Sequence, residues 1–331
     1  KCHTSISAIS AMLSVHWSTI QKIQKHIMDK ALAAFEVCLK KSNYHPKYLA
    51  VDEFAIHKGH RYATCVMDLE TGFILWAGLG RSMADFEYFF KSIDLSLLSE
   101  LKAVAMDMNA SFNRLFQRYC PDVPIVYDRY HMQAQFGRDV MGAVRLAEAQ
   151  KHRQEAEALK KYTKETNNPE LQNMAKEKSR KERNQYTQLK KSRWILLKKD
   201  DHLNEKQKIH LLDILNKHRD LAICYAMKQE MTRLFTLTDY EEALAGWTKW
   251  IQAGLASGIP ALVKFARQKQ KRIKGLAAHA LYPINTGKLE GFNNKIKVLK
   301  RIGYGYRNMD YFFALIRFHS LPKNYSSPKF P

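Results

Sequence analysis

The hydrophobic pattern changes its period at residue 48, where short apolar runs typical of strands begin. Four stretches carry these runs: YLAVDEFAI (48–56), RYATCVMDLETGFILWAGLG (61–80), LKAVAMDM (101–108) and VPIVYD (123–128). The second stretch indicates two strands, because Glu70-Thr71-Gly72 supplies the chemistry of a turn between them. Apolar residues at helical spacing occupy 82–97 and 110–119. The pattern predicts an α/β core of three antiparallel-type strands, then helix, strand, helix and strand.

Residues 129–250 form a different region, since they lack long strand-like runs and are rich in helix-forming Lys, Glu, Gln, Ala and Leu. Within it, residues 151–200 carry 15 Lys and Arg against 7 Asp and Glu, with few aromatic residues. This composition predicts long solvated helices, interrupted near Asn167-Asn168-Pro169. Residues 203–256 return to a helical apolar period and should pack as a bundle.

Residues 4–30 indicate two short helices around a tight turn at Ser14-Val15, with the second helix beginning near Trp17. Two interpretations stay open for this segment. It is a partial helix-turn-helix whose second helix enters the major groove of DNA, or it is a plain helical hairpin. Because the chain does not begin with Met and opens as if inside a helical unit, we expect an N-terminal piece to be missing.

Net charge is the strongest compositional signal, with 54 Lys and Arg against 32 Asp and Glu, a balance of +22. Such a charge attracts polyanions, and nucleic acid is the first candidate. A ribosome-like binder or a basic protein of the membrane surface also fits the charge. No apolar run approaches the roughly 20 residues of a membrane span. Five scattered cysteines exclude a local CxxC-type zinc site and fit free thiols in a reducing cytoplasm.

Asp52 and Asp107 each follow a short apolar run, where a rigid strand would meet solvent. Two carboxylates on neighbouring strands repel each other unless a cation neutralises them, and a small set of oxygen ligands suits Mg²⁺ or Mn²⁺. Such a site fits the hydrolysis or transfer of phosphodiesters. The alternative is that each acid ends its strand in water. Glu53 should point to the opposite face of the strand from Asp52 and is the poorer ligand.

Four blocks of the sequence follow one another between about residues 48 and 320: LAVDEFAIHKGHRYATCVMDLETG, VAMDMNASFNRLF, IVYDRYHMQ and NTGKLEGFNNKIKVLKRIGYGYRN. These blocks, and their order, resemble the DDE transposases of ISL-type bacterial insertion sequences. The resemblance implies a ribonuclease H-like (retroviral integrase-like) core with Asp52, Asp107 and Glu290 as catalytic acids and metal ligands. It further implies two Mg²⁺ or Mn²⁺ ions as cofactors, and cleavage and strand transfer of DNA.

The long separation of Asp107 and Glu290 then requires an inserted helical domain. We expect a partial helix-turn-helix over 1–47, the first part of the core over 48–134, an all-helical insertion over 135–270 and the last part of the core over 271–331. The YDRYH block places Asp128 and His131 near the acids. They either orient a ligand or a phosphate, or they are a helix cap and a packed histidine.

The stretch 262–307 has 12 Lys and Arg and a single acid, Glu290, for a net charge of +11. We expect it to bind phosphates without reading sequence. The candidate DNA-contacting residues around Glu290 are Lys288, Asn293, Asn294, Lys297, Arg301 and Arg307. The rival interpretation is a solvated helical face.

The resemblance implies double-stranded DNA as partner, both element ends and target, with a homodimer or higher assembly on DNA and no membrane association. It implies a bacterial cytoplasmic, nucleoid-associated location. Two other function classes stay open: a catalytically inactive or truncated transposase-derived DNA-binding protein, and a metal-dependent nuclease that cuts without strand transfer.

Overall fold

The computed structural model describes residues 4–57 and 61–322 of the chain. It divides into two compact units, one formed by residues 1–128 and 282–331 and the other by residues 129–281. The first unit therefore consists of two pieces of the chain, and the second is a continuous insertion between them. Among the described helices, none is long and apolar enough to cross a membrane.

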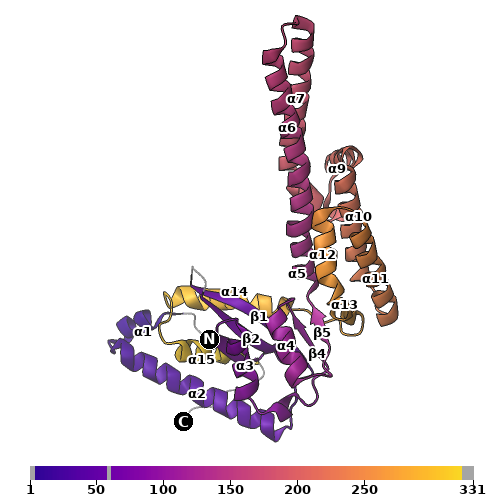
Figure 1. Cartoon of the computed structure of the whole chain (residues 1–331). Coiled ribbons are helices and arrows are strands. Elements are labelled where there is room, and N and C mark those ends of the chain that lie inside the picture. The colour runs from indigo at the N-terminus through magenta and orange to yellow at the C-terminus, as the bar shows by residue number, and fades with distance from the viewer. Residues whose placement is uncertain (1–3, 58–60, 323–331) are drawn as a thin grey trace. The chain divides into compact units, whose positions relative to one another are not determined.

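A mixed five-stranded sheet is the centre of the first unit (Figure 1). Its strands are β1 (Tyr48–His57), β2 (Arg61–Asp68), β3 (Ile74–Leu79), β4 (Ala103–Met106) and β5 (Ile125–Tyr127). They lie in the order β3-β2-β1-β4-β5. β1, β2 and β3 pair antiparallel, whereas β4 pairs parallel with both β1 and β5. The predicted five strands and their order along the chain are therefore present.

Both faces of this sheet are covered by helices, because successive residues of a strand point to opposite sides. Leu49 and Val51 of β1 pack on one face with helices α3 (Met83–Ser92) and α4 (Ala110–Tyr119). Ala50 and Phe54 pack on the other face. That second face is covered by α14 (Gly287–Ile302) and α15 (Met309–Ser320), from the C-terminal piece of the chain.

The helix predicted over 82–97 is divided in the structure. α3 ends at Ser92, and a separate 3₁₀ turn follows over Leu95–Leu98. The side chain of Asp94 accepts a hydrogen bond from the backbone N–H of Ser96 and so begins the new turn. At its start, α3 has a capping box formed by Ser82 and Asp85. The prediction was wrong here because apolar spacing does not detect a local cap.

The N-terminal helices are α1 (Ile6–Leu13) and α2 (Trp17–Lys41). Ser14 adopts the left-handed conformation at the predicted turn. The second helix is much longer than expected, because its C-terminal half buries Ala31, Leu32 and Phe35 against Phe73 and the end of α15. Tertiary packing therefore extends this helix beyond the segment that the sequence pattern indicated.

The second unit is helical throughout, and residues 129–281, all of which are described, contain no strand. A π-helical segment (Gly137–Gly142) joins its first two helices. The helices are α5 (Arg129–Phe136), α6 (Ala143–Glu165), α7 (Pro169–Lys191), α8 (Arg193–Leu197), α9 (Glu205–Lys217), α10 (Arg219–Leu234), α11 (Tyr240–Ala256), α12 (Pro260–Gln270) and α13 (Ile273–Ala277). The break predicted near Asn167-Asn168-Pro169 is confirmed, with Asn168 as the cap of α7 and Pro169 as its first residue.

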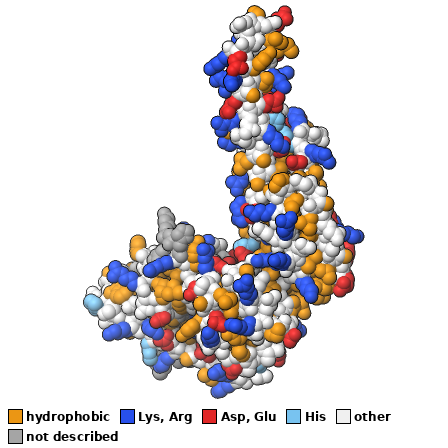
Figure 2. Space-filling model, in the orientation of Figure 1, with side chains coloured by type: hydrophobic (Ala, Val, Ile, Leu, Met, Phe, Trp, Pro, Cys, Tyr) orange, Lys and Arg blue, Asp and Glu red, His pale blue; other side chains and the backbone are white. Residues whose placement is uncertain are grey.

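The helices of this unit differ in whether their side chains are solvated or buried. α6 and α7 form a long pair whose Lys and Arg side chains alternate with Asp and Glu (Figure 2). Arg153 with Glu157 and Lys178 with Glu155 are examples of ion pairs on it. In contrast, Trp247 and Trp250 of α11 are fully or almost fully buried, and the Trp250 ring packs against Phe136 and Phe265. The aromatic bundle therefore supplies the core of this unit.

Replacing Phe86 tests the aromatic core of the first unit. The Phe86 ring is fully buried, and its centroid lies 4.4 Å from that of Phe112 and 5.7 Å from that of Phe90. We expect Phe86→Ala to lower the free energy of unfolding by about 3–5 kcal/mol, measured by urea denaturation. Tyr88→Ala is the matched control on the same helix, because Tyr88 is 68% exposed, and should change it by no more than about 0.5 kcal/mol. Equal losses in both variants would contradict this packing.

Candidate active site

Three aspartates form a row across the parallel part of the sheet. Val51 of β1 is in register with Met106 of β4, which is in register with Tyr127 of β5. The next residue of each strand is an aspartate: Asp52, Asp107 and Asp128. Because the side-chain alternation of a sheet has a period of two, residues that continue the same register point to the same face. That face is the one covered by α14.

The pairing pattern shows where these positions lie in the sheet, and it corrects one expectation. Asp52 does not end its strand, since β1 continues to His57 through antiparallel pairing with β2. What ends at Asp52 is the parallel pairing with β4. Asp107 and Asp128 do follow the last residues of β4 and β5. The parallel pairing of β1, β4 and β5 therefore ends directly before the three carboxylates.

The Asp52 carboxylate is held in place by two donors. Its Oδ1 accepts a hydrogen bond of 2.8 Å from the backbone N–H of Glu53, and its Oδ2 accepts one of 2.7 Å from the Nδ2 of Asn293. A carboxylate oxygen of Asp107 lies within 4.8 Å of one of Asp52. Two ionised carboxylates this close repel each other, so the pair favours a bound cation.

Glu53 lies on the opposite face of β1, as the alternation predicts. Its Oε1 accepts a hydrogen bond of 2.8 Å from Asn109, the N-cap of α4, and its Oε2 lies 3.8 Å from the guanidinium of Arg81. Burial raises the pKa of the Glu53 carboxyl, and the Asp107 charge adds to the rise, while Asn109 and Arg81 oppose it. Glu53 thus has its own partners in the protein.

Helix α14 brings the C-terminal piece of the chain to the aspartates. Asn293, which bonds to Asp52, lies one turn after Glu290 on this helix. Side chains three residues apart on a helix are neighbours, with about 5–6 Å between their Cβ atoms. A carboxylate oxygen of Glu290 also lies within 4.8 Å of one of Asp128. The structure therefore brings all three predicted catalytic acids to the same face of the sheet.

Thr286, the N-cap of α14, links Asp128 to Glu290. Its backbone N–H donates to Oδ2 of Asp128 over 2.9 Å. Its hydroxyl lies 2.9 Å from the same oxygen and 3.2 Å from Oε1 of Glu290. One hydroxyl proton cannot be donated to both carboxylates, so the two hydrogen bonds compete. Thr286 is not among the residues singled out from the sequence, and a capping pattern would not have revealed this role, because its side chain makes no capping hydrogen bond to α14.

The donor set fits a divalent cation that prefers oxygen ligands. Asp52, Asp107 and Glu290 are partly buried, and Asp128 is only 4% exposed. The Oδ1 of Asn293 is buried and has no hydrogen-bond partner among the described residues. Carboxylate and amide oxygens with room for water are typical ligands of Mg²⁺ and Mn²⁺. His131, the other residue of the YDRYH block singled out above, belongs to α5 in the second unit, where its ring meets Tyr130 edge to face.

The basic residues of α14 divide into two groups. Three of its lysines donate to backbone carbonyls elsewhere in the first unit: Lys288 to Leu69 and Glu70, Lys295 to His319, and Lys300 to Ala55. Asn293 is buried against Asp52, as described above. Five of the predicted DNA-contacting residues are exposed and lie along or just after α14: Lys288, Asn294, Lys297, Arg301 and Arg307. Of these, Lys288 also attaches the helix to the Leu69 and Glu70 carbonyls.

Known transposases are similar to this chain over most of its length. A family model described as "Transposase" matches residues 49–316. The transposase for insertion sequence element IS1001 of Bordetella parapertussis is 32% identical over 315 residues, which are 95% of this chain and 69% of the relative. The transposase for insertion sequence element IS1557 of Mycobacterium tuberculosis (strain ATCC 25618 / H37Rv) is 23% identical over 318 residues, covering 94% of this chain and 67% of the relative. The chain therefore belongs to the ISL3-type family of DDE transposases.

Proposed function

We propose that this transposase cuts and rejoins the ends of an insertion sequence with Asp52, Asp107 and Glu290 as its catalytic acids. The observation that carries the proposal is the hydrogen bond from Asn293 to Asp52, which ties the helix of Glu290 to the row of aspartates. Residues separated by 241 positions in the chain thereby meet at one place. A structural role alone does not require like charges to converge, because their repulsion lowers the stability of the fold.

The family uses divalent metal ions, and we propose that the three acids hold two Mg²⁺ or Mn²⁺ ions. When bound, such ions activate the attacking oxygen and stabilise the leaving one in phosphodiester transfer. The protein's own contribution is to orient the ligands. Asn293 and the Glu53 N–H fix the Asp52 carboxylate, while Thr286 positions Asp128 beside Glu290. We propose that Asp128 and His131 orient a ligand or a phosphate.

For the fold, we propose a ribonuclease H-like core. Three antiparallel strands followed by two parallel ones, with acids beside β1 and after β4, support it. For the domains, we propose the division expected from the sequence, 1–47, 48–134, 135–270 and 271–331, whereas the compact units divide at 128/129 and 281/282. For α1 and α2 we propose a partial helix-turn-helix that contacts the element ends.

We propose that the exposed residues of α14 hold double-stranded DNA through its phosphates. Lys297 and Arg301 are four residues apart and therefore lie on one face of the helix, and Arg307 follows in the next loop. An element has two ends, and each must be cut, so we propose that at least two copies of the chain assemble on DNA. A nuclease with the same acids would cut without joining, and an inactive DNA-binding protein would do neither.

Substitution of the acids tests the catalytic assignment. We expect Asp52→Asn, Asp107→Asn or Glu290→Gln to lower Mg²⁺-dependent strand cleavage by about a thousandfold or more, since each removes a metal ligand. DNA affinity should stay near normal or increase, as measured on the same duplex without divalent metal. Asp94→Asn, on the far 3₁₀ turn, is the matched control and should keep full activity. If Glu53→Gln abolished cleavage and Asp52→Asn did not, Glu53 rather than Asp52 would be the metal ligand on β1.

Asn293→Ala should act through the metal rather than through DNA. Without its amide, Asp52 loses a donor that orients it, and the Mg²⁺ concentration for half-maximal cleavage should rise about 10–100-fold. The neighbouring Asn294 is exposed, so Asn294→Ala is the control and should leave the Mg²⁺ requirement unchanged. An equal Mg²⁺ requirement in both variants would show that the Asn293 bond has no role at the site.

Salt dependence tests how α14 holds DNA. Each phosphate contact contributes a slope of about −0.9 to log K against log salt concentration. Lys297→Ala with Arg301→Ala should therefore weaken binding to all duplexes alike and make the slope shallower by about two units. Lys300→Met removes the same charge from the same helix, but its ammonium donates to the Ala55 carbonyl, so it should leave the slope unchanged. If the double variant keeps the wild-type slope, the α14 face is only solvated.

A further inference from the structure

The loop between α14 and α15 presents an aromatic ring to solvent. Tyr304, within the sequence Gly303-Tyr304-Gly305-Tyr306, is 97% exposed. Its φ is +49°, and that of Gly305 is +95°, so two successive residues adopt the left-handed conformation. A bulky residue rarely does so, because its Cβ crowds the backbone, and such strain is concentrated at functional sites. A tyrosine held outward in this way has no packing role that explains it.

The loop around Tyr304 is fixed to the end of α14. The backbone N–H of Tyr304 donates to the Arg301 carbonyl over 3.2 Å, and that of Gly305 donates to the Lys300 carbonyl over 3.0 Å. Tyr306 stacks on Phe312 with the ring centroids 4.7 Å apart. A Cβ at Gly303 would come within 2.5 Å of the Tyr306 ring, so this glycine permits the close packing. Tyr304 is therefore presented by a preorganised backbone rather than by a loosely held one.

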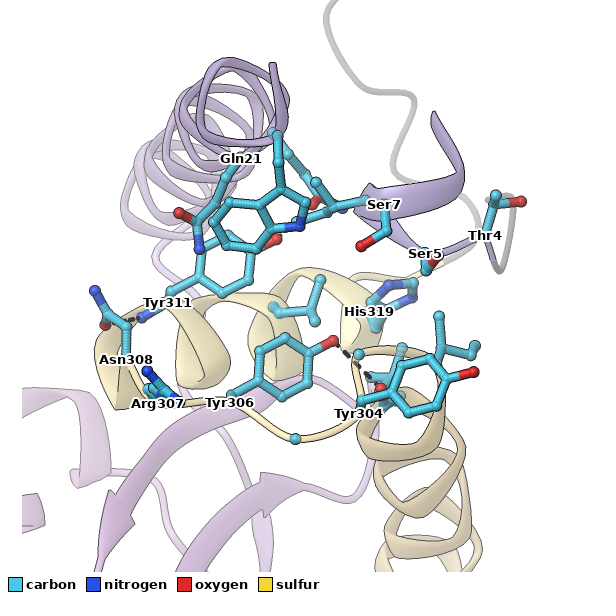
Figure 3. A pocket seen from close by; sticks show the side chains of 18 residues that line it. Thr4, Ser5, Ser7, Gln21, Tyr304, Tyr306, Arg307, Asn308, Tyr311 and His319 are labelled. Atoms are coloured by element: carbon cyan, nitrogen blue, oxygen red, sulfur yellow. Dashed lines mark hydrogen bonds between the residues drawn. The ribbon is translucent and has the colours of Figure 1, made fainter. Parts of the chain in front are cut away.

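A cavity of about 420 Å³ opens beside this loop (Figure 3). The loop forms one side of it, and the opposite side is formed by α1 and the start of α2, including Ser7 and Gln21. Trp17, the first residue of α2, also lines the cavity. Among its described lining residues, none is a carboxylate and Arg307 is the only permanently charged side chain. Its volume lies within the range of roughly 300–1,000 Å³ that is typical of ligand pockets. Residues 304–307 also line a second cavity, with Arg61 and Tyr62.

We propose that this cavity and Tyr304 bind an unpaired base of the DNA strand. Aromatic rings, neutral amides and hydroxyls together suit a planar heterocycle with both donors and acceptors, and Arg307 suits the phosphate next to it. A base in an intact duplex cannot enter, because its faces are stacked on its neighbours and its edge is paired. The absence of carboxylates among the described lining residues fits a strand that carries negative charge.

The loop follows the C-terminal end of α14, and the length of this helix sets the distance between the bound base and the scissile phosphate. Glu290 lies at the N-terminal end of the helix and the loop follows its C-terminal end, so about 18 Å of helix separates them. For a strand that runs along α14 at about 3.4 Å per nucleotide, the bound base would be about five nucleotides from the scissile phosphate. This position rests on the proposed function, whereas binding of the base itself does not.

Three DNA probes of one arbitrary sequence test the proposal: a fully paired duplex, the same duplex with a single bulged adenine, and the same duplex with a bulged abasic nucleotide. Affinity is measured with the full chain at one salt concentration and without divalent metal. We expect the adenine bulge to bind at least about fivefold more tightly than the abasic bulge, because stacking of a base on an aromatic side chain contributes that much. The abasic bulge is equally flexible but offers no base to stack.

Variants then assign the preference to Tyr304. Tyr304→Ala should reduce the ratio of affinities for the adenine bulge and the abasic bulge to about one. Tyr304→Phe should keep the wild-type ratio, and so should Tyr88→Ala, at another exposed tyrosine. A ratio of one in the wild type, or an unchanged ratio in Tyr304→Ala, overturns the proposal. Because no cleavage is measured, failure here leaves the assignment of Asp52, Asp107 and Glu290 standing, and their failure leaves the base-binding result standing.

Discussion

The register of β1, β4 and β5 is the constraint on which the site depends. Once Val51, Met106 and Tyr127 are aligned, the pleat directs Asp52, Asp107 and Asp128 to one face of the sheet. A slip of one residue in β4 would move Asp107 to the face of α3 and α4, away from Asp52. The buried apolar residues on both faces of the sheet prevent that slip, so the hydrophobic core determines where the charges converge.

The second unit can be inserted without disturbing this site, because the segments just before and just after it are hydrogen-bonded to each other within the first unit. The chain leaves the first unit after Asp128 and returns at Tyr282. Thr286, only a few residues after the return, donates its backbone N–H to the Asp128 carboxylate. That contact starts α14 at the row of aspartates and thereby places Glu290 and Asn293. A long helical insertion thus need not disturb the catalytic face.

Positive charge has two separate uses on α14. Lys288, Lys295 and Lys300 bond to backbone carbonyls and so attach the helix to the β2–β3 turn, to α15 and to β1. Lys297 and Arg301 are exposed on the same helix. A count of charges along the chain cannot separate these uses, since a long lysine side chain reaches either solvent or a carbonyl several ångströms away.

The sequence by itself determined the order of the strands along the chain and the helical character of residues 129–250, because apolar periodicity is a local property. Its resemblance to a known family indicated the set of three candidate acids. The sequence also predicted that Asp52 and Glu53 point to opposite faces of the strand, since the backbone fixes the alternation of side chains. Only the tertiary structure decided that β1 runs past Asp52, that α2 extends to Lys41 and that Asn293 faces Asp52 rather than solvent. It alone revealed Thr286 and the exposed Tyr304 as features of interest. These depend on contacts between segments far apart in the chain, whose energies no local pattern records.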